Sequence, residues 1–424
     1  MKIPSKLLAY ESPMEKDTRA VEASYLPPKK RLRSYMEIPS KFLAIRQCEP
    51  PVKKHAKPTR VVETTSLPSK KRMHSGADWS YLHKDMLEEI AARVAAFDVV
   101  DYLKFRDVCT SWRSAFVEGK KKLPSLIPWI FSYDSADKRI GVEEHKFKYS
   151  LVNPFNNKLQ WLNSWRVRTE YCGGSSKGWI LMADWNKSNE VHLLNPLTNM
   201  QVPLPSIRQP YMIENVVLSS PPISGDDESC VVMAIVCDRS RGCAKWQLAF
   251  CKPGDDIWTM IGGQLPHYVD ITYCNGLFYV LSYNEILAVF CDACKCGPSP
   301  KPIEICKLPE SVRGNRCHLV ESSGDLLLIS VKIYNKKVTI LKVDLIRQKW
   351  LEVTNIGDQT VFVSDHNSIS MLASTHPLNK PNCIYLGYFD WLGIYNLKDA
   401  SYEAFLCNRR IRGTECTWIT PSPW

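Results

Sequence analysis

The 424-residue sequence lacks any apolar run of about 18 residues, the length that a membrane-spanning helix needs. The N-terminal region, which begins with Met1-Lys2-Ile3-Pro4-Ser5-Lys6, also lacks the apolar stretch of about 7–15 residues that marks a secretory signal. We therefore expect no membrane association. We also expect the sixteen cysteines to be reduced thiols in the cytosol or nucleus, because disulfides accumulate in oxidising compartments.

Short enzyme motifs are missing as well. The sequence contains no G-x-x-x-x-G-K-[ST] loop, no H-E-x-x-H helix, no G-x-S-x-G turn and no strand-linked G-x-G-x-x-G. Its nine histidines show no spacing that pairs one of them with a nucleophile. These absences predict a non-catalytic protein that needs no cofactor.

One group of cysteines resembles half of a metal site. Cys291, Cys294 and Cys296 lie within six residues, in a segment that contains Gly and Pro. A structural zinc site usually has a second, separated pair of ligands, and that pair is missing here. We expect free thiols in a loop and no metal, with zinc as the alternative that the sequence leaves open.

Basic charge is concentrated at the N-terminus. Residues 1–78 hold 17 of the 55 Lys and Arg but only 8 of the 44 Asp and Glu, a surplus of nine, whereas the remainder has a surplus of two. The segment also carries nine prolines and repeats itself, because residues 3–9 and 26–31 return at 38–44 and 67–72. We predict a disordered, duplicated basic tail over 1–77.

Two clusters in this tail are typical of nuclear-import signals. They are Lys29, Lys30, Arg31 and Arg33, and Lys70, Lys71 and Arg72. They predict an import receptor as partner and a location in the nucleus, with the cytoplasm as a second location; a solvated basic tail is the alternative. Nucleic acid is not the expected partner, because the body is nearly neutral and the tail lacks interleaved aromatic residues.

Residues 78–120 have a helical pattern. Apolar side chains recur at three- and four-residue steps in the first part, Asp98 is a suitable N-cap for a second helix, and a third apolar face follows. Three short helices are too few to form a large core.

From residue 125 to 424 the pattern changes to short β-rich runs. Five of them share a phase and start at residues 179, 231, 277, 326 and 384. A β unit of about 50 residues is the size of a four-stranded kelch-like propeller blade, so the interval predicts a mainly β fold with a C-terminal propeller. A large β-sandwich is the alternative, and the number of blades stays open.

Aromatic residues give two further expectations for the propeller. Trp258 and Trp350 follow the later strands of their units and should wedge between neighbouring blades. Trp418 and Ile419 would form an exposed apolar tail unless they were docked, so we expect the C-terminal segment to pair near Trp129 and close the ring.

The helical segment resembles the F-box, through its apolar first helix, the Asp98-Val99-Val100-Asp101 turn and the Val-Cys-x-x-Trp-Arg element. It departs from the usual F-box at Leu82-His83, where Leu-Pro is common. The resemblance implies that the segment contacts a Skp-type adaptor. The residues it assigns to the module's core and contact face are Leu82, Leu87, Ile90, Val94, Val99, Val108, Cys109 and Trp112.

The C-terminal part resembles the KIB-type propeller of plant F-box proteins. The resemblance lies in the succession Lys349-Trp350-Leu351-Glu352-Val353, Asn382-Cys383-Ile384-Tyr385, Gly393-Ile394-Tyr395-Asn396-Leu397 and Trp418-Ile419-Thr420-Pro421-Ser422. Together the two resemblances imply the substrate-recognition subunit of an SCF-type ubiquitin ligase, linked through the adaptor to a cullin–RING ligase and holding an unidentified protein substrate. The alternative is a propeller scaffold or transcription-associated protein with a degenerate F-box.

Overall fold

The structure is a computed structural model, and it describes residues 82–97, 101, 105, 108–119, 127–135, 147–155, 159–161, 170–184, 190–207, 211–222, 230–238, 245–265, 267–289, 302–388, 391–405 and 415–422. Contacts divide the chain between Ala77 and Asp78. All described residues belong to the second unit, so the predicted basic tail and both import clusters lie outside them. The roles assigned to 1–77, 78–120 and 125–424 stay predictions.

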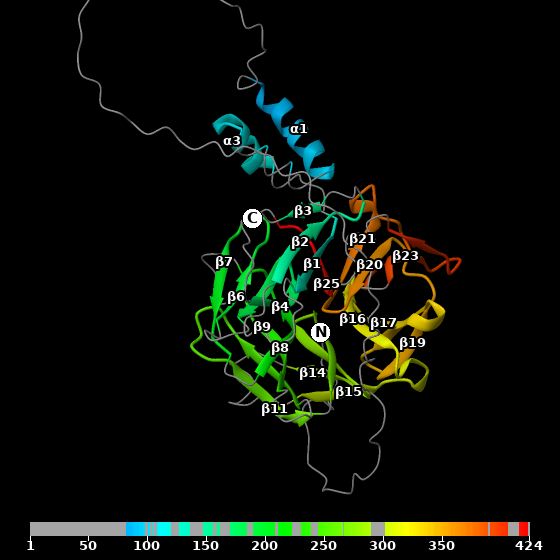
Figure 1. Ribbon diagram of the computed structural model, residues 1–424. Coiled ribbons are helices and arrows are strands. Elements are labelled where there is room, and N and C mark those ends of the chain that lie inside the picture. Colours follow the sequence, from blue (N-terminus) through cyan, green and yellow to red (C-terminus); the bar gives the residue numbers. More distant parts are fainter. Residues whose placement is uncertain are drawn as a thin grey trace, which may run out of the picture. The chain divides into compact units, whose positions relative to one another are not determined.

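The described strands form six sheets, which we number as blades 1 to 6 (Figure 1). Blade 1 consists of β25 (Glu415–Ile419), β1 (Trp129–Ser135), β2 (Phe147–Val152) and β3 (Leu159–Trp161). Blade 2 consists of β4 (Glu170–Ser176), β5 (Trp179–Asp184), β6 (Val191–Leu194) and β7 (Gln201–Leu204). Blade 3 consists of β8 (Tyr211–Leu218), β9 (Val232–Asp238), β10 (Lys245–Cys251) and β11 (Thr259–Leu265).

Blade 4 consists of β12 (Tyr268–Cys274), β13 (Leu277–Ser282), β14 (Glu285–Val289) and β15 (Ile303–Lys307). Blade 5 consists of β16 (Arg316–Ser322), β17 (Asp325–Lys332), β18 (Lys337–Asp344) and β19 (Lys349–Val353). Blade 6 consists of β20 (Gln359–Ser364), β21 (Asn367–Leu372), β22 (Cys383–Tyr388), β23 (Trp391–Asn396) and β24 (Tyr402–Ala404). Short 3-10 turns cover Glu310–Val312, Ile333–Asn335 and Ala373–Thr375. The mainly β prediction and the propeller prediction are confirmed, with six blades.

Tight hairpin turns explain the common phase of the predicted runs. Lys177-Gly178, Asn275-Gly276 and Ser323-Gly324 each join a first strand to a second strand, and all six residues have positive φ. Two consecutive residues with positive φ form the turn whose twist matches that of the flanking strands, and this turn favours Gly at its second position. The predicted runs are therefore the second strands β5, β9, β13 and β17, which follow the turns or, in blade 3, a longer connection.

Blade 6 departs from this plan. Its order is β21-β20-β22-β23-β24, and β20 runs parallel to β22 whereas its other neighbour, β21, is antiparallel. The extra strand takes the inner position in this blade. It accounts for the longer interval before the last predicted run, Ile384-Tyr385-Leu386, which forms part of β22.

The ring closes through strands from both ends of the propeller. Neighbouring inner strands contact one another in the order β25, β4, β8, β12, β16, β21 and back to β25. Strand β25 pairs with β1 in antiparallel fashion, with Trp129 opposite Ile419 and Ile130 opposite Trp418. The predicted docking of the C-terminal segment is confirmed.

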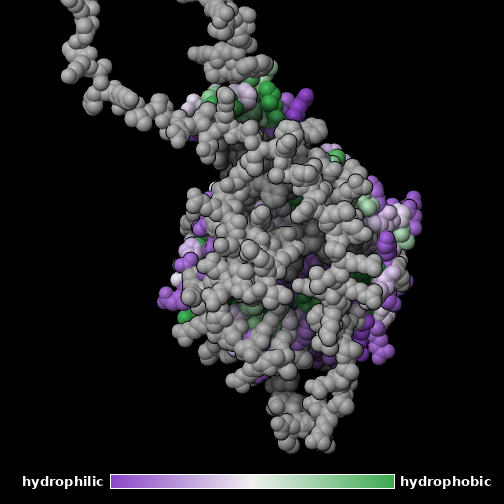
Figure 2. Space-filling view, viewed as in Figure 1, coloured by the Kyte–Doolittle hydropathy of each residue, from purple (hydrophilic) through white to green (hydrophobic). Residues whose placement is uncertain are grey.

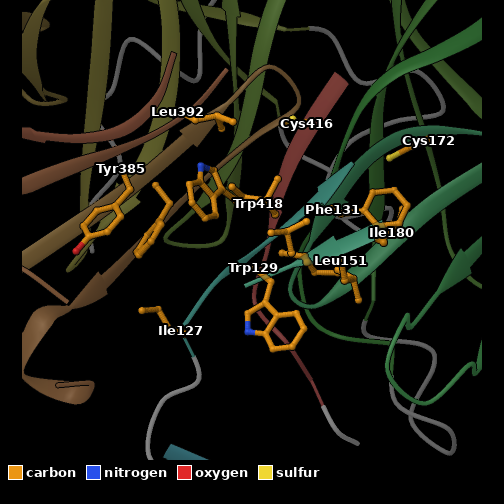
Figure 3. Close-up of a cluster of buried hydrophobic side chains, with 14 of the residues drawn as sticks. Ile127, Trp129, Phe131, Leu151, Cys172, Ile180, Tyr385, Leu392, Cys416 and Trp418 are labelled. Carbon is orange, nitrogen blue, oxygen red and sulfur yellow. The ribbon is translucent and has the colours of Figure 1, made fainter. Parts of the chain in front are cut away.

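Trp418 lies among the buried side chains of this closure and contacts the rings of Phe362 and Phe405 (Figure 3). Its side chain is fully buried, its ring lies edge-on to Phe362 at 5.1 Å, and its indole N–H donates to the carbonyl of Val363 at 3.0 Å. Gly387 leaves room for it, because a Cβ at that position would come within 2.6 Å of the indole nitrogen. The indole thus links blade 1 to blade 6.

The two tryptophans predicted to act as wedges join adjacent blades. The indole N–H of Trp258 in blade 3 donates to the carbonyl of Pro205 after β7 at 2.7 Å, and that of Trp350 in blade 5 donates to Lys307 in blade 4 at 2.7 Å. This prediction is confirmed. Both residues are structural.

Two helices are described before the propeller, α1 (Lys84–Phe97) and α3 (Thr110–Gly119). Most residues of the predicted second helix, including Val99, lie outside the described residues, so the three-helix module stays a prediction. Neither described helix is long and apolar enough to cross a membrane.

Removal of β25 tests the closure. Deleting residues 411–424 should give aggregated or protease-sensitive protein, because β1 would lose the strand it pairs with and β4 would lose an adjacent inner strand. The milder Trp418→Ala exchange should lower the free energy of unfolding by about 3–5 kcal/mol. Urea unfolding measures this loss, with Ile346→Ala as the control, since Ile346 is 83% exposed and its loss should stay within about 0.5 kcal/mol. A truncated chain that stays monomeric with an unchanged melting temperature would contradict the closure.

Candidate functional site

The pair of helices α1 and α3 has a small core of its own. Leu87, Ala91 and Phe105 are buried, at 2%, 1% and 5% exposure. The partly buried side chains of Leu82, Ile90, Val94 and Trp112 pack around them. Positions 87, 91 and 94 follow a helical stripe at i, i+4 and i+7, which explains why this face of α1 turns inward.

Trp112 belongs to this core. Its ring lies 4.4 Å from the ring of Phe105, at an interplanar angle of 37°. The turn before α3 is held by a hydrogen bond from the amide of Arg113 to the carbonyl of Cys109 at 2.9 Å, and by a contact of 3.1 Å between Cys109 Sγ and Ser111 Oγ. Trp112 and Phe105 therefore fix α3 against the preceding segment.

The outer surface of the pair carries exposed apolar side chains. Met86 is 55% exposed and Val108 is 57% exposed. Figure 2 shows hydrophobic residues next to hydrophilic ones on the described part of the helices. Exposed apolar atoms are available for a partner, whereas Leu87 is not.

Of the eight predicted adaptor-binding residues, Val99 lies outside the described residues, and the other seven fall into three groups. Leu87 is buried; Leu82, Ile90, Val94, Cys109 and Trp112 have intermediate exposure; and Val108 is exposed. The prediction included neither Met86, which is exposed, nor Phe105, which belongs to the core. Met86 could have been found, because it lies beside Leu87 and outside the stripe of positions 87, 91 and 94.

Two other groups singled out in the sequence lie outside the described residues. These are the import clusters and Cys291, Cys294 and Cys296, for which we expected free thiols and no metal. Cys306 and Cys317, which follow that group, are buried free thiols. Among the residues that the structure describes, no group of three or more His, Cys, Asp or Glu is arranged to hold a metal ion.

A buried polar network joins the blades around the propeller axis. Asp270 on β12 accepts hydrogen bonds of 2.8 Å from the side chain of Asn215 on β8, from its neighbour Ile271 and from the amide of Leu319 on β16. Asn215 and Asp270 each follow a β-bulge in the inner strand. A bulge re-aims the side chain beside it, which explains how these polar groups reach the next blade.

The network continues from blade 4 to blade 6. The imidazole Nδ1 of His318 lies 3.7 Å from the Asp270 carboxylate, and its Nε2 shares a hydrogen bond of 2.6 Å with the hydroxyl of Tyr388. The guanidinium of Arg316 lies over the Tyr388 ring at 5.0 Å and is paired with Asp365 at 2.6 Å. Four blades are thereby tied together.

The remaining junctions use Asn367 at the start of β21. Its amide nitrogen donates to Ser175 Oγ on β4 at 2.8 Å and to the carbonyl of Trp418, and its amide oxygen accepts from the amide of Trp418 at 3.0 Å. The side chain therefore pairs with β25 as a backbone peptide would. His366, next to it, contacts the carbonyl of Glu214 on β8 at 3.3 Å, so the turn between β20 and β21 reaches blades 1, 2 and 3.

Burial sets the protonation of this network. It raises the pKa of the Asp270 carboxyl to about 7, although three donors oppose the change. Burial, followed by the charge of Arg316, lowers the pKa of His318 to about 3. Asp270, His318 and Tyr388 are at most 6% exposed, so a substrate cannot reach them. The arrangement joins blades and is not suited to catalysis.

Comparison with known proteins agrees with this architecture. The family model "KIB1-4 beta-propeller" matches residues 149–405. An F-box/kelch-repeat protein of Arabidopsis thaliana is 28% identical over 300 residues, which cover 67% of this chain and 77% of that protein. A probable F-box protein of the same plant is 27% identical over 350 residues, covering 73% and 89%.

The Asp270 pKa gives a prediction with a definite sign. A raised carboxyl pKa stabilises the fold at low pH, and this contribution is lost as the pH rises from 3.8 to about 7. A lowered imidazole pKa stabilises the fold at high pH, and this contribution is lost as the pH falls from 6.5 to about 3. Between these limits the two slopes oppose each other in the parent chain.

Asp270→Asn removes the carboxyl and leaves the His318 slope. The variant should be less stable than the parent, because Asn cannot accept all three hydrogen bonds, and its deficit should shrink by about 1 kcal/mol per pH unit between about pH 4.5 and 6.5. Urea unfolding at both pH values measures this change. Ser330→Ala removes a neutral hydrogen bond of 2.9 Å to Asn315 and should show a constant deficit. A constant deficit in Asp270→Asn would refute the assigned shift.

Proposed function

Because this chain belongs to the KIB1-4 β-propeller family and is similar to plant F-box proteins over most of its length, we propose that it is the substrate-recognition subunit of an SCF-type ubiquitin ligase. In this proposal the helical pair contacts a Skp-type adaptor, through which the chain joins a cullin–RING ligase. The propeller holds a protein substrate. The observation that carries the proposal is a helical pair with exposed apolar side chains directly before a closed propeller.

The exposed side chains Met86 and Val108 are the best candidates for the adaptor contact. Apolar groups at the centre of an interface contribute most of the binding energy when a partner removes them from water. The core residues Leu87, Phe105 and Trp112 contribute indirectly, since they hold α1 and α3 in place. This division gives different expectations for substitutions on the face and in the core.

The propeller suits the second half of the task. The strand pairing of its closure and its buried polar network make it a stiff scaffold, and loops on a stiff scaffold keep a bound protein in a fixed position. Such an adaptor needs no catalytic group, because holding substrate and ubiquitin-charged enzyme together makes the transfer nearly intramolecular. We also propose that the protein is located in the nucleus. This part of the proposal rests only on the sequence of the two import clusters.

Charge placed on the proposed adaptor face tests the first half. Met86→Glu and Val108→Glu should each weaken capture of a purified Skp-type adaptor by about tenfold or more, with little change in melting temperature, since both side chains are exposed. Ile346→Glu is the matched control, because it places the same charge on an exposed apolar residue of blade 5 and should bind normally. Trp112→Ala should instead lose binding together with the fold of the helical pair, by about 2–4 kcal/mol.

Unchanged binding of both charged variants would reject this contact face. If the wild-type chain does not capture the adaptor at all, the propeller works without ubiquitin ligation and the scaffold alternative applies.

Nuclear import is tested separately. Replacing Lys29, Lys30, Arg31 and Arg33 together with Lys70, Lys71 and Arg72 by alanine should shift a fluorescently tagged full chain toward the cytoplasm, because an import receptor reads the basic side chains. Adaptor binding should not change. Replacement of Lys2, Lys6 and Lys16, outside both clusters, is the control. A wild-type chain that is wholly cytoplasmic would refute the import proposal and leave the ligase proposal intact.

A further inference from the structure

An aromatic cluster lies where strand ends of blades 3 and 4 meet. Trp246 stands near the start of β10, His267 lies in the connection from β11 to β12, and Tyr283 lies in the connection from β13 to β14. Trp246 is opposite Leu265, two residues before His267. Tyr283 follows Ser282, the last residue of β13. The ends of these strands bring three rings from three segments together.

The rings form a continuous group that is open to solvent. The rings of Trp246 and His267 are 4.6 Å apart, and those of His267 and Tyr283 are 5.8 Å apart at an angle of 76°. Tyr283 is 42% exposed, and His267 is also exposed. The backbone of His267 has a φ of 38°, which is uncommon for a residue with a side chain, and this conformation places its ring between the other two.

The surroundings of the cluster favour a positive charge. Glu285 follows Tyr283 by two residues. In the pairing of β14 with β15, Glu285 lies opposite Lys307 and Leu287 lies opposite Glu304. Burial and the Glu304 carboxylate raise the pKa of Glu285, and Lys307 opposes this only in part. Although the residue is exposed, partial burial of its imidazole lowers the pKa of His267 from the ordinary value of 6.5. The imidazole is therefore neutral near pH 7 and does not repel a cation.

A neighbouring tyrosine adds an unused polar group. Tyr268 is 2% exposed, and among the residues that the structure describes its hydroxyl has no hydrogen-bond partner. Burial raises the pKa of this phenol, and the charge of nearby Glu285 raises it further. Two carboxylates beside one lysine, an orphaned hydroxyl and three rings make up the chemistry of this edge.

We propose that Trp246, His267 and Tyr283, together with the carboxylate of Glu285, bind a lysine or arginine side chain of the protein that the propeller recognises. Aromatic ring faces attract cations. The negative charge of the carboxylate also attracts a cation, whereas it gives no advantage to an uncharged aliphatic side chain. Only the identity of the bound protein rests on the proposed ligase function. Binding of the cationic side chain itself does not.

Small peptides and the full chain test the site. The probes are N-acetyl-Gly-Lys-Gly-amide and the same peptide with norleucine, which has the length of lysine but no charge. The reporter is the indole N–H signal of Trp246 in the NMR spectrum of the chain labelled in tryptophan, identified by its disappearance in Trp246→Phe. The lysine peptide should shift this signal in a saturable way, and the norleucine peptide should bind about three- to fivefold more weakly or not at all.

Variants locate the effect. Tyr283→Ala and Glu285→Gln should each weaken the lysine peptide by about three- to fivefold, with the other indole signals unchanged as evidence that the fold is intact. Tyr334→Ala is the matched control, because Tyr334 is a fully exposed tyrosine in the corresponding connection of blade 5 and should have no effect. Equal binding of both peptides, or equal loss in the Tyr283 and Tyr334 variants, would overturn the proposal.

Two further outcomes are informative. If the Trp246 signal of the free full chain moves when Lys29, Lys30 and Arg31 are replaced by alanine, the site holds the chain's own basic tail, and a partner side chain is overturned as the occupant. Adaptor capture is measured on the same protein. A chain that binds the lysine peptide without capturing the adaptor retains this site and refutes the ligase proposal, and the reverse result refutes the site alone.

Discussion

Pairing of β25 with β1 is the contact on which the propeller depends. Strand β25, which is five residues long, takes the inner position of blade 1, whose other strands begin almost 300 residues earlier. The inner strands of blades 2 and 6 both contact β25. The closure is secured by Trp418, which fills the space left by Gly387, and by Asn367, which completes the hydrogen bonds of the Trp418 backbone. Without this strand the inner surfaces of blades 1, 2 and 6 would face water.

The polar groups along the axis complement that apolar closure. A buried carboxylate or amide destabilises a fold unless it is hydrogen-bonded. Asp270 and Asn367 each make three or more hydrogen bonds, of which two for Asp270 and at least three for Asn367 go to other blades. Because these bonds are directional, they fix the rotation of one blade relative to the next, which apolar contacts do less well. The proposed role as a substrate adaptor requires a propeller of such fixed geometry.

Much of this architecture could be predicted from the sequence because it depends on residues that are close together in the chain. Lys177-Gly178, Asn275-Gly276 and Ser323-Gly324 specify tight turns, and the apolar runs that follow them specify buried strands. Trp418 was informative because an apolar terminus requires a partner. In contrast, nothing near Asn367 indicates a fifth strand in blade 6, since its partners Ser175 and Trp418 are distant in sequence.

The candidate sites were harder to predict for the same reason. Spacing placed Leu87 and Trp112 in the helical module, but it could not separate core from surface, which depends on the packing of Phe105 against α3. Trp246, His267 and Tyr283 have no common motif, because their proximity arises from the pairing of four strands in two blades. Residues that come together only through tertiary contacts leave no periodic trace in a sequence.

The position of β25 also fixes when the protein can fold during its synthesis. Strands β1 to β3 leave the ribosome early, yet their blade stays incomplete until β25 has been translated. The ring thus depends on contacts of very large sequence separation, which slow folding and leave strand edges exposed in the nascent chain. A chain that stops before Glu415 lacks β25, and the inner edge of β1 then has no strand to pair with.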